Sequence, residues 1–199
     1  MGRKSLAGQR SKQIISAFSS CILKYGLVES SLEKVATEAG IKRGIIRHYI
    51  GNRDKLLKAL VDDVTDTYLN DFRANFGKLP TQDLVQGLIN YLFPGPTYEL
   101  TINDMLVYRL LAGCDQEPYI KKLLSDFFNT IENELILILT KAHPQADKKD
   151  CAKVAYATLC LMCGHYDFAF LKSETQQQNS VIRHATKYLI ESLGNQFSP

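Results

Sequence analysis

Apolar residues recur every three or four positions along most of the chain, which is the spacing of one face of an α-helix. The first such stripe is made of Ile14, Phe18, Cys21 and Tyr25. Gly26 follows it and is expected to end the helix. No stretch sustains the alternation of apolar and polar residues that marks a β-strand, so the pattern predicts an all-α protein.

A short second helix is predicted after the turn that follows. Its apolar face consists of Leu32, Val35, Ala36 and Ala39. Ser30 and Glu33 have the three-residue spacing of a capping box, which satisfies free backbone N–H groups at a helix start. Gly40 is expected to end this helix.

A third helix is predicted at about residues 42–48, directly after the glycine-containing turn. Close crossing with the second helix would be permitted by the small residues Ala36, Ala39 and Gly44. Anchoring apolar contacts would come from Ile41, Ile45 and Ile46. The outer side is then left to Lys42, Arg43, Arg47 and His48. This outline is that of a helix-turn-helix, whose second helix meets phosphates and guanine edges in the major groove.

The rest of the chain predicts about six more helices. Asn52 can cap a fourth, whose apolar face comprises Leu56, Leu60, Val64, Tyr68, Phe72 and Phe76. Five further helices are separated by Pro80, the FPGP break at 93–96, Pro118, Pro144 and the polar run at 172–179. We expect a helix-turn-helix domain over residues 1–52 and a ligand-binding and dimerisation domain over residues 53–199, joined by a continuous fourth helix.

The distribution of charge supports this division. Residues 1–60 contain 12 Lys and Arg against 4 Asp and Glu, whereas the remainder contains 12 against 17. Such asymmetry suggests that the first part meets a polyanion such as nucleic acid. Charge alone leaves open a basic face that is merely solvated.

The segment SSLEKVATEAGIKRGIIRHYIGNRDKLLKAL resembles the DNA-binding region of the TetR family of transcriptional regulators, over about residues 10–60. Its part GIIRHYIGNRDKLL is most similar to the BetI-type branch, which regulates choline and betaine metabolism. The C-terminal half contains no such motif.

The resemblance implies roles for individual residues. Ser31 would open the second helix near a phosphate, and Arg43 and Ile45 would face base edges. The predicted DNA-binding set is Ser31, Lys42, Arg43, Gly44, Ile45, Arg47, His48, Tyr49, Arg53 and Lys55. Lys42 occupies a position where the family usually has a capping Ser or Thr, so the recognition helix is expected to lack that cap.

A single recognition helix reads too few bases, so we expect a homodimer on a pseudo-palindromic operator in double-stranded DNA. The predicted interface is the last two helices, because CAKVAYATLCLMCGHYDFAFL is apolar nearly all round. The last helix would add Val181, Ala185, Tyr188, Leu189 and Leu193. A monomer that buries these side chains internally is the alternative.

TetR-like proteins usually enclose a small-molecule effector among their C-terminal helices. The candidate ligand-binding residues are Tyr91, Asp104, Met105, Tyr108, Phe128, Met162, His165 and Phe168. The BetI-like resemblance suggests a quaternary amine, held in an aromatic cage near Asp104 or Asp167. The alternative is that most of these side chains belong to an ordinary core.

No enzyme motif is present: a Walker A loop, HExxH, GxSxG and a dinucleotide glycine fingerprint are all lacking. Cys160, Cys163 and His165 do not share one helical face, so we expect structural buried thiols, no metal and no cofactor. The longest apolar stretch, at 154–164, is too short for a membrane span, and the five cysteines fit a reducing cytoplasm.

The sequence therefore predicts a TetR-type repressor whose dimer is released from its operator by a small-molecule effector. The alternative outside the enzymes is a structural or low-specificity DNA-binding protein without an effector.

Overall fold

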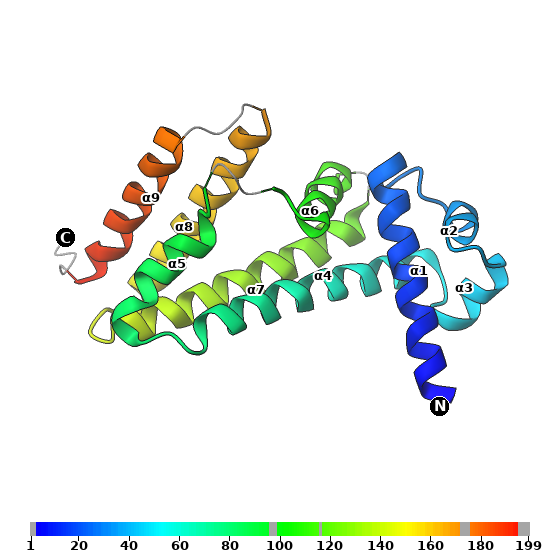
Figure 1. Cartoon of the computed structure of the whole chain (residues 1–199), viewed down its shortest axis with the longest axis horizontal. Coiled ribbons are helices and arrows are strands. Elements are labelled where there is room, and N and C mark those ends of the chain that lie inside the picture. Colours follow the sequence, from blue (N-terminus) through cyan, green and yellow to red (C-terminus); the bar gives the residue numbers. More distant parts are fainter. Residues whose placement is uncertain (1–2, 96–98, 116, 172–175, 195–199) are drawn as a thin grey trace. The chain divides into compact units, whose positions relative to one another are not determined.

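The computed structural model describes residues 3–95, 99–115, 117–171 and 176–194. Within these residues the chain forms nine α-helices and two short 3-10 helices, and no strand, which confirms the all-α prediction (Figure 1). The α-helices are α1 (Arg3–Tyr25), α2 (Leu32–Glu38), α3 (Arg43–Tyr49), α4 (Arg53–Phe76), α5 (Leu84–Leu92), α6 (Ile102–Gly113), α7 (Pro118–Ala142), α8 (Lys148–Leu171) and α9 (Gln176–Glu191). The 3-10 helices are η1 (Thr81–Asp83) and η2 (Ser192–Gly194).

Two compact units make up the chain. Unit 1 comprises Met1–Tyr68 and Leu100–Phe127, and unit 2 comprises Leu69–Glu99 and Phe128–Pro199. Helices α4 and α7 contribute residues to both units. This division follows packing, and it does not test the functional division at residues 52 and 53, which stays a prediction.

Unit 1 is built around α1, which packs against α2, α3 and α6 (Figure 1). The stripe expected from the sequence faces inward, since Ile14, Phe18 and Cys21 are fully buried. Facing residues of the same core include Val35, Ile46, Leu56, Leu60, Leu106 and Leu110. The first helix therefore serves as the support on which the two short helices are held.

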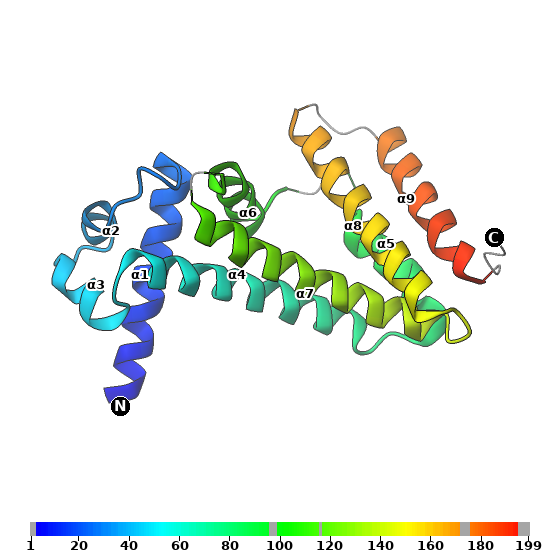
Figure 2. The same ribbon diagram turned by 180° about the vertical axis from the view of Figure 1, so that it is seen from behind.

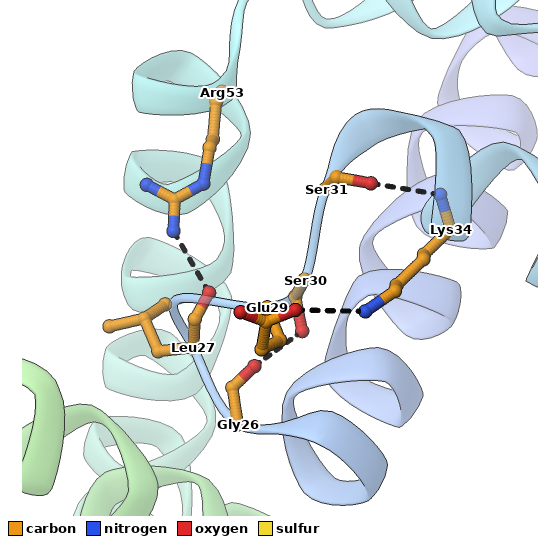
Figure 3. Close-up of polar contacts among 7 residues, drawn as sticks. All are labelled: Gly26, Leu27, Glu29, Ser30, Ser31, Lys34 and Arg53. Atoms are coloured by element: carbon orange, nitrogen blue, oxygen red, sulfur yellow. Dashed lines mark hydrogen bonds and ion pairs between the residues drawn. The ribbon is translucent and has the colours of Figure 1, made fainter.

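The beginning of α2 differs from the predicted capping box. Ser31, not Ser30, is the N-cap residue, and its Oγ accepts a hydrogen bond from the Lys34 N–H at 3.3 Å. Ser30 is fully buried, and its Oγ donates to the Gly26 carbonyl at 2.7 Å (Figure 3). Gly26 has a φ of +79°, which glycine adopts without strain and which lets the chain turn here. The N-cap is therefore one residue later than predicted, and Lys34, the third residue of the helix, has no carboxylate that could complete a capping box.

Unit 2 contains α5, α8 and α9 with the later parts of α4 and α7. Helices α8 and α9 run side by side and α5 packs against α9 (Figure 2). Its core comprises Phe72, Phe76, Leu84, Leu88, Leu135, Leu139, Cys151, Ala155, Ile190 and Leu193. The C-terminal end of α5 is closed by two hydrogen bonds: Tyr166 Oη donates to the Leu92 carbonyl at 3.0 Å, and Arg183 Nη1 to the Phe93 carbonyl at 2.5 Å. The five helices expected after the fourth are thus present as α5 to α9.

Candidate nucleic-acid interface

Helix α3 has one fully buried side chain, which packs into the core of unit 1. Ile46 is 0% exposed, and it is the buried residue of this seven-residue helix. The other face carries the exposed side chains of Lys42, Arg43, Ile45, Arg47 and His48, together with Gly44. A helix anchored on one side and cationic on the other has the form needed to enter a major groove.

Two residues lie on this outer face although we expected them to pack against α2. Ile45 is 37% exposed, because a one-residue step turns a helical side chain by about 100° away from Ile46. A Cβ at Gly44 would meet nothing within 4 Å, so Gly44 is not required for close helix crossing. The anchor role expected of Ile45 and the close-crossing role expected of Gly44 are therefore both wrong. Their exposure is compatible with the base-facing positions that the resemblance implies.

The turn between α2 and α3 is stabilised by hydrogen bonds from the backbone and from a side chain of α1. Gly40 has a φ of +64°, and the Ile41 N–H donates to the Ala36 carbonyl at 2.9 Å. Gln13 Nε2 in α1 donates to the Ala39 carbonyl at 2.9 Å. Lys42 is the N-cap of α3 and makes no side-chain capping bond, as its departure from Ser or Thr predicts. Contacts with α1 and α2, instead of a cap, position this helix.

Three glutamates in or just before α2 are each paired with a cation. Glu33 forms an ion pair with Arg43, Glu29 with Lys34 at 3.3 Å, and Glu38 with Lys24 at 2.7 Å. Within the described part of the chain, Lys42, Arg47 and Lys55 have no carboxylate partner. The surface around α3 therefore keeps an excess of positive charge after its internal pairs are formed.

The remaining expected DNA contacts lie in different settings. His48 is exposed and meets the edge of the half-buried Tyr49 ring at 4.9 Å between centroids. Ser31 is half-buried at the start of α2, and Lys55 is exposed in the first turn of α4. Asn52 Oδ1 accepts from the Lys55 N–H at 3.0 Å, which confirms the predicted cap. Arg53 is different, since only 25% of its side chain is exposed and it bonds inside unit 1.

The structure divides the expected effector-binding residues between the two units. Unit 1 contains Asp104, the half-buried Tyr108 and the exposed Met105. Asp104 closes a capping box with Thr101 and also accepts a hydrogen bond from Tyr68 Oη, so both of its carboxylate oxygens already have donors. These bonds give Asp104 a structural role at the start of α6.

Unit 2 contains Tyr91, Phe128, Met162 and His165, all half-buried, together with Phe168, which is 69% exposed. The Tyr91 ring meets Phe72 and Phe76 at centroid distances of 5.6 and 5.5 Å. The His165 ring meets Phe93 at 5.4 Å and Tyr166 at 5.5 Å. Two aromatic groups therefore lie in this unit, one on α4 and α5 and one on α8 with Phe93.

The thiols of α8 only partly match the expectation of buried structural cysteines. Cys160 is exposed, contrary to that expectation, whereas Cys163 is half-buried. Burial, with a smaller contribution from the Asp167 carboxylate, raises the pKa of the Cys163 thiol to about 11. No group of three or more His, Cys, Asp or Glu side chains placed to hold a metal occurs among the described residues. No helix in that part of the chain combines the length and apolar character needed to cross a membrane.

Comparison with known sequences links the chain to transcriptional regulators. It is 35% identical over 104 residues to the HTH-type transcriptional regulator PksA of Bacillus subtilis strain 168, which is 50% of this chain and 48% of that protein. It is 32% identical over 77 residues, 39% of either chain, to the HTH-type transcriptional regulator BetI of Vibrio vulnificus strain YJ016. The matches span less than half the length of these relatives. No protein-family model matches the chain.

Solved structures share the fold over nearly the whole chain. A transcriptional regulator from Pseudomonas aeruginosa PAO1 has a TM-score of 0.79 over 96% of this chain and 95% of its own, at 18% identity. A TetR-family regulator from Rhodococcus sp. has a TM-score of 0.71 over 93% and 98%, also at 18% identity. The multidrug binding protein EbrR complexed with imidazole has a TM-score of 0.68 over 91% and 89%, at 17% identity.

These similarities confirm the TetR-type resemblance through the fold and the BetI-like resemblance through the sequence. The sequence relatives are transcriptional regulators, which are not a class of enzymes. The features of unit 1 that sequence reasoning missed are the ion pair of Arg43 with Glu33 and the bonds of Arg53 with Glu117 and Leu27. Glu117 lies 64 residues from Arg53, and no local motif links residues at that separation.

Proposed function

We propose that this protein is a transcriptional repressor that binds a pseudo-palindromic operator in double-stranded DNA as a homodimer. The single observation that carries the proposal is that α3 has one buried side and one exposed, cationic side. Ile46 is buried, while Lys42, Arg43, Arg47 and His48 point outward. Arg43 and Arg47 lie four residues apart and therefore share one face of the helix, from which both can reach the groove. Similarity to helix-turn-helix regulators supports this interpretation.

The proposed dimer interface lies on α8 and α9. Large apolar side chains are exposed on these helices: Tyr156 (61%), Phe168 (69%), Val181 (63%) and Tyr188 (76%). Ala185 is exposed as well, whereas Leu193 is 7% exposed and belongs to the core of unit 2. The surface we propose is therefore smaller than the one expected from sequence. A second copy of the chain would remove these side chains from water.

Release from the operator is proposed to require a small molecule bound by unit 2. Its candidate contacts are Tyr91, Phe128, Met162 and His165, together with Phe168, which also belongs to the proposed dimer interface. The quaternary amine suggested by resemblance stays one class to be tested. The imidazole complex of EbrR supports a small-molecule site within this fold. Asp104, Met105 and Tyr108 remain secondary candidates, because the Asp104 carboxylate is already bonded within unit 1.

The experiment that tests the proposal is selection from a random duplex DNA library at near-physiological salt, followed by sequencing of the retained DNA. Enrichment of a pseudo-palindrome with half-sites about one helical turn apart would support a sequence-specific dimer. Retention without enrichment, with binding that falls steeply as salt rises, would favour the alternative of a low-specificity DNA-binding protein. The enriched duplex would then serve to screen small molecules for release.

A further inference from the structure

Arg53 bonds to two other segments of unit 1 from the start of α4. Its Nη2 donates to the Leu27 carbonyl at 2.9 Å, in the turn between α1 and α2 (Figure 3). Its Nη1 contacts Glu117 Oε1 at 2.5 Å, and the side chains of Arg53 and Glu117 are each 25% exposed. Glu117 immediately precedes Pro118, the first residue of α7. One guanidinium therefore joins the α1–α2 turn, α4 and the beginning of α7.

Leu27 is held from a second side by α6. Its side chain is 3% exposed, and it lies against Gly113 at the end of that helix. A Cβ at Gly113 would lie 2.8 Å from Leu27 Cδ2 and 3.3 Å from Leu27 Cβ. The same residue thus contacts α4 through its carbonyl and α6 through its side chain.

This turn leads directly to the beginning of α2. The Leu27 carbonyl also accepts from the Ser30 N–H at 3.3 Å, and Ser30 is fully buried. Ser31 follows as the N-cap of α2. The donor from Arg53 therefore acts one turn before the helix that supports α3.

We infer that Arg53 is a positioning residue for DNA binding, which together with Glu117 fixes the α1–α2 turn and the helices that follow it. The inference rests on the proposed function. It differs from the expectation that Arg53 contacts a DNA phosphate directly, because Nη1 and Nη2 of Arg53 already donate to Glu117 and to the Leu27 carbonyl inside unit 1. Charge-assisted bonds of this kind are strong and geometrically specific.

The effect of Glu117→Gln on DNA affinity distinguishes a positioning role of Arg53 from a direct phosphate contact, because the two roles predict changes of opposite sign. If Arg53 contacts a phosphate, Glu117 competes with DNA for the guanidinium, and Glu117→Gln should strengthen binding. If Arg53 positions the turn, Glu117→Gln removes part of its support and should weaken binding. The substitution keeps the size of the side chain and removes only its charge.

The chain offers a control ion pair that also links α4 to the chain segment of α7. Arg73 in α4 pairs with Glu134 in α7 at 2.5 Å, twenty residues further along α4 than Arg53. Arg73→Met and Glu134→Gln therefore remove an α4–α7 ion pair that has no bond to the α1–α2 turn. Gly113→Ala is a charge-neutral variant that acts on Leu27 from α6.

The test measures affinity for the selected duplex over a range of salt concentrations. We expect Arg53→Met to weaken binding about tenfold, as for loss of a hydrogen bond to a charged group. Glu117→Gln should weaken it by a smaller factor, because the amide oxygen can still accept from Arg53 but carries no charge. Gly113→Ala should act in the same direction, and the Arg73 and Glu134 controls should stay within about twofold of the parent. Arg53→Lys should also bind more weakly, because an ammonium does not reproduce the two-pronged guanidinium geometry.

The salt dependence gives a second readout. Loss of a phosphate contact lowers the slope of log K against log salt by about 0.9 per contact, whereas loss of positioning leaves the number of phosphates unchanged. An unchanged slope for Arg53→Met supports the inference. A reduced slope, or tighter binding by Glu117→Gln, overturns it.

Amide hydrogen exchange tests, without DNA, whether Arg53 and Glu117 stabilise the α1–α2 turn. The Ser30 and Lys34 amides, which bond to Leu27 O and Ser31 Oγ, should exchange faster in Glu117→Gln and Arg53→Lys than in Glu134→Gln. Equal exchange in all three variants overturns the inference even if Arg53→Met does not fold. A wild-type protein that selects no DNA overturns the proposed function instead, so the two failures are distinguishable.

Discussion

The outer face of α3 and the outer face of α8 and α9 are both exposed, but they present different side chains to solvent. Around α3 the exposed groups are cationic, with Arg47 and Lys42 as examples. On α8 and α9 they include large apolar side chains, of which Tyr188 and Val181 are the most exposed on α9. Exposed cations are well hydrated, whereas a group of exposed apolar side chains indicates a surface that another molecule covers.

Under the proposed function, the difference predicts two kinds of association. Binding through α3 should depend steeply on salt, because it exchanges counterions for side-chain cations on the phosphates. Association through α8 and α9 should depend on protein concentration and little on salt, because apolar burial drives it. Each prediction below changes one of these surfaces, or the buried side chain that supports it, and compares the change with a matched variant.

The largest effect is expected from Arg43→Ala combined with Arg47→Ala. Two protomers each lose two contacts, at about 1 kcal/mol or more per contact, so operator affinity should fall on the order of a thousandfold. Both side chains are exposed, so the melting temperature should hardly change. Fluorescence anisotropy with the selected duplex measures the affinity, and thermal unfolding checks the fold.

The control for this pair is Lys148→Ala with Lys149→Ala, which removes the same charge from the exposed beginning of α8. Binding by the control should change by less than about threefold, since only long-range attraction is lost. If the two double variants weaken binding equally, net charge and not the α3 face accounts for DNA binding.

The next largest effect separates two neighbours in α3. Ile46→Ala empties a fully buried position and should lower the free energy of unfolding by about 3 kcal/mol. Ile45→Ala should leave that free energy within about 0.5 kcal/mol, because Ile45 is 37% exposed, while it alters base preference in the groove. Urea unfolding of the two variants checks the first statement, and a repeated DNA selection checks the second. Equal destabilisation by both would show that α3 is anchored through its whole apolar side.

Local signals were sufficient to predict the helix-turn-helix. Each of these signals spans only a few residues. The buried stripe that includes Ile14 and Phe18 recurs every three or four positions, and Gly26 and Gly40 follow helices directly, so spacing alone locates the helices. Spacing did not distinguish Ile45 from Ile46, since both are apolar and adjacent, and only the packing partner decides which one is buried. Nor could it find Glu117, whose bond to Arg53 depends on the path of the chain through two further helices.

In unit 2 the sequence predicted helices but few individual roles. Apolar residues surround α8, so periodicity could not show which face packs inside the unit. The structure buries Ala155 and leaves Tyr156 61% exposed, although the two are neighbours. Likewise Leu193 was expected on an outer surface, but η2 turns it into the core. Tertiary packing decides whether such an apolar residue lies in the core or on an outer surface, because its hydrophobicity is compatible with either position.

A smaller effect is expected from Val181→Asp on α9. A charge in the proposed interface should weaken dimerisation about thirtyfold, as loss of a central apolar contact does. Leu137→Asp in α7 is the matched control, since Leu137 and Val181 are both 63% exposed and both belong to unit 2. Sedimentation at several protein concentrations measures the dimer constant. If Leu137→Asp dissociates the dimer and Val181→Asp does not, the interface lies elsewhere in unit 2.

The smallest effect concerns the ion pair between Glu33 and Arg43 within the DNA-binding face. Glu33→Gln releases Arg43 and removes a carboxylate from a surface that would approach phosphates, so DNA affinity should rise roughly threefold at low salt. Glu38→Gln is the control, because Glu38 lies in the same helix but pairs with Lys24 of α1. Binding should be measured with the selected duplex and with a scrambled one. A released Arg43 is expected to raise affinity more for the scrambled duplex than for the selected one, and so to reduce discrimination between the two. Weaker binding by Glu33→Gln would mean that Glu33 holds Arg43 in its DNA-contacting geometry, and that the pair does not compete with DNA.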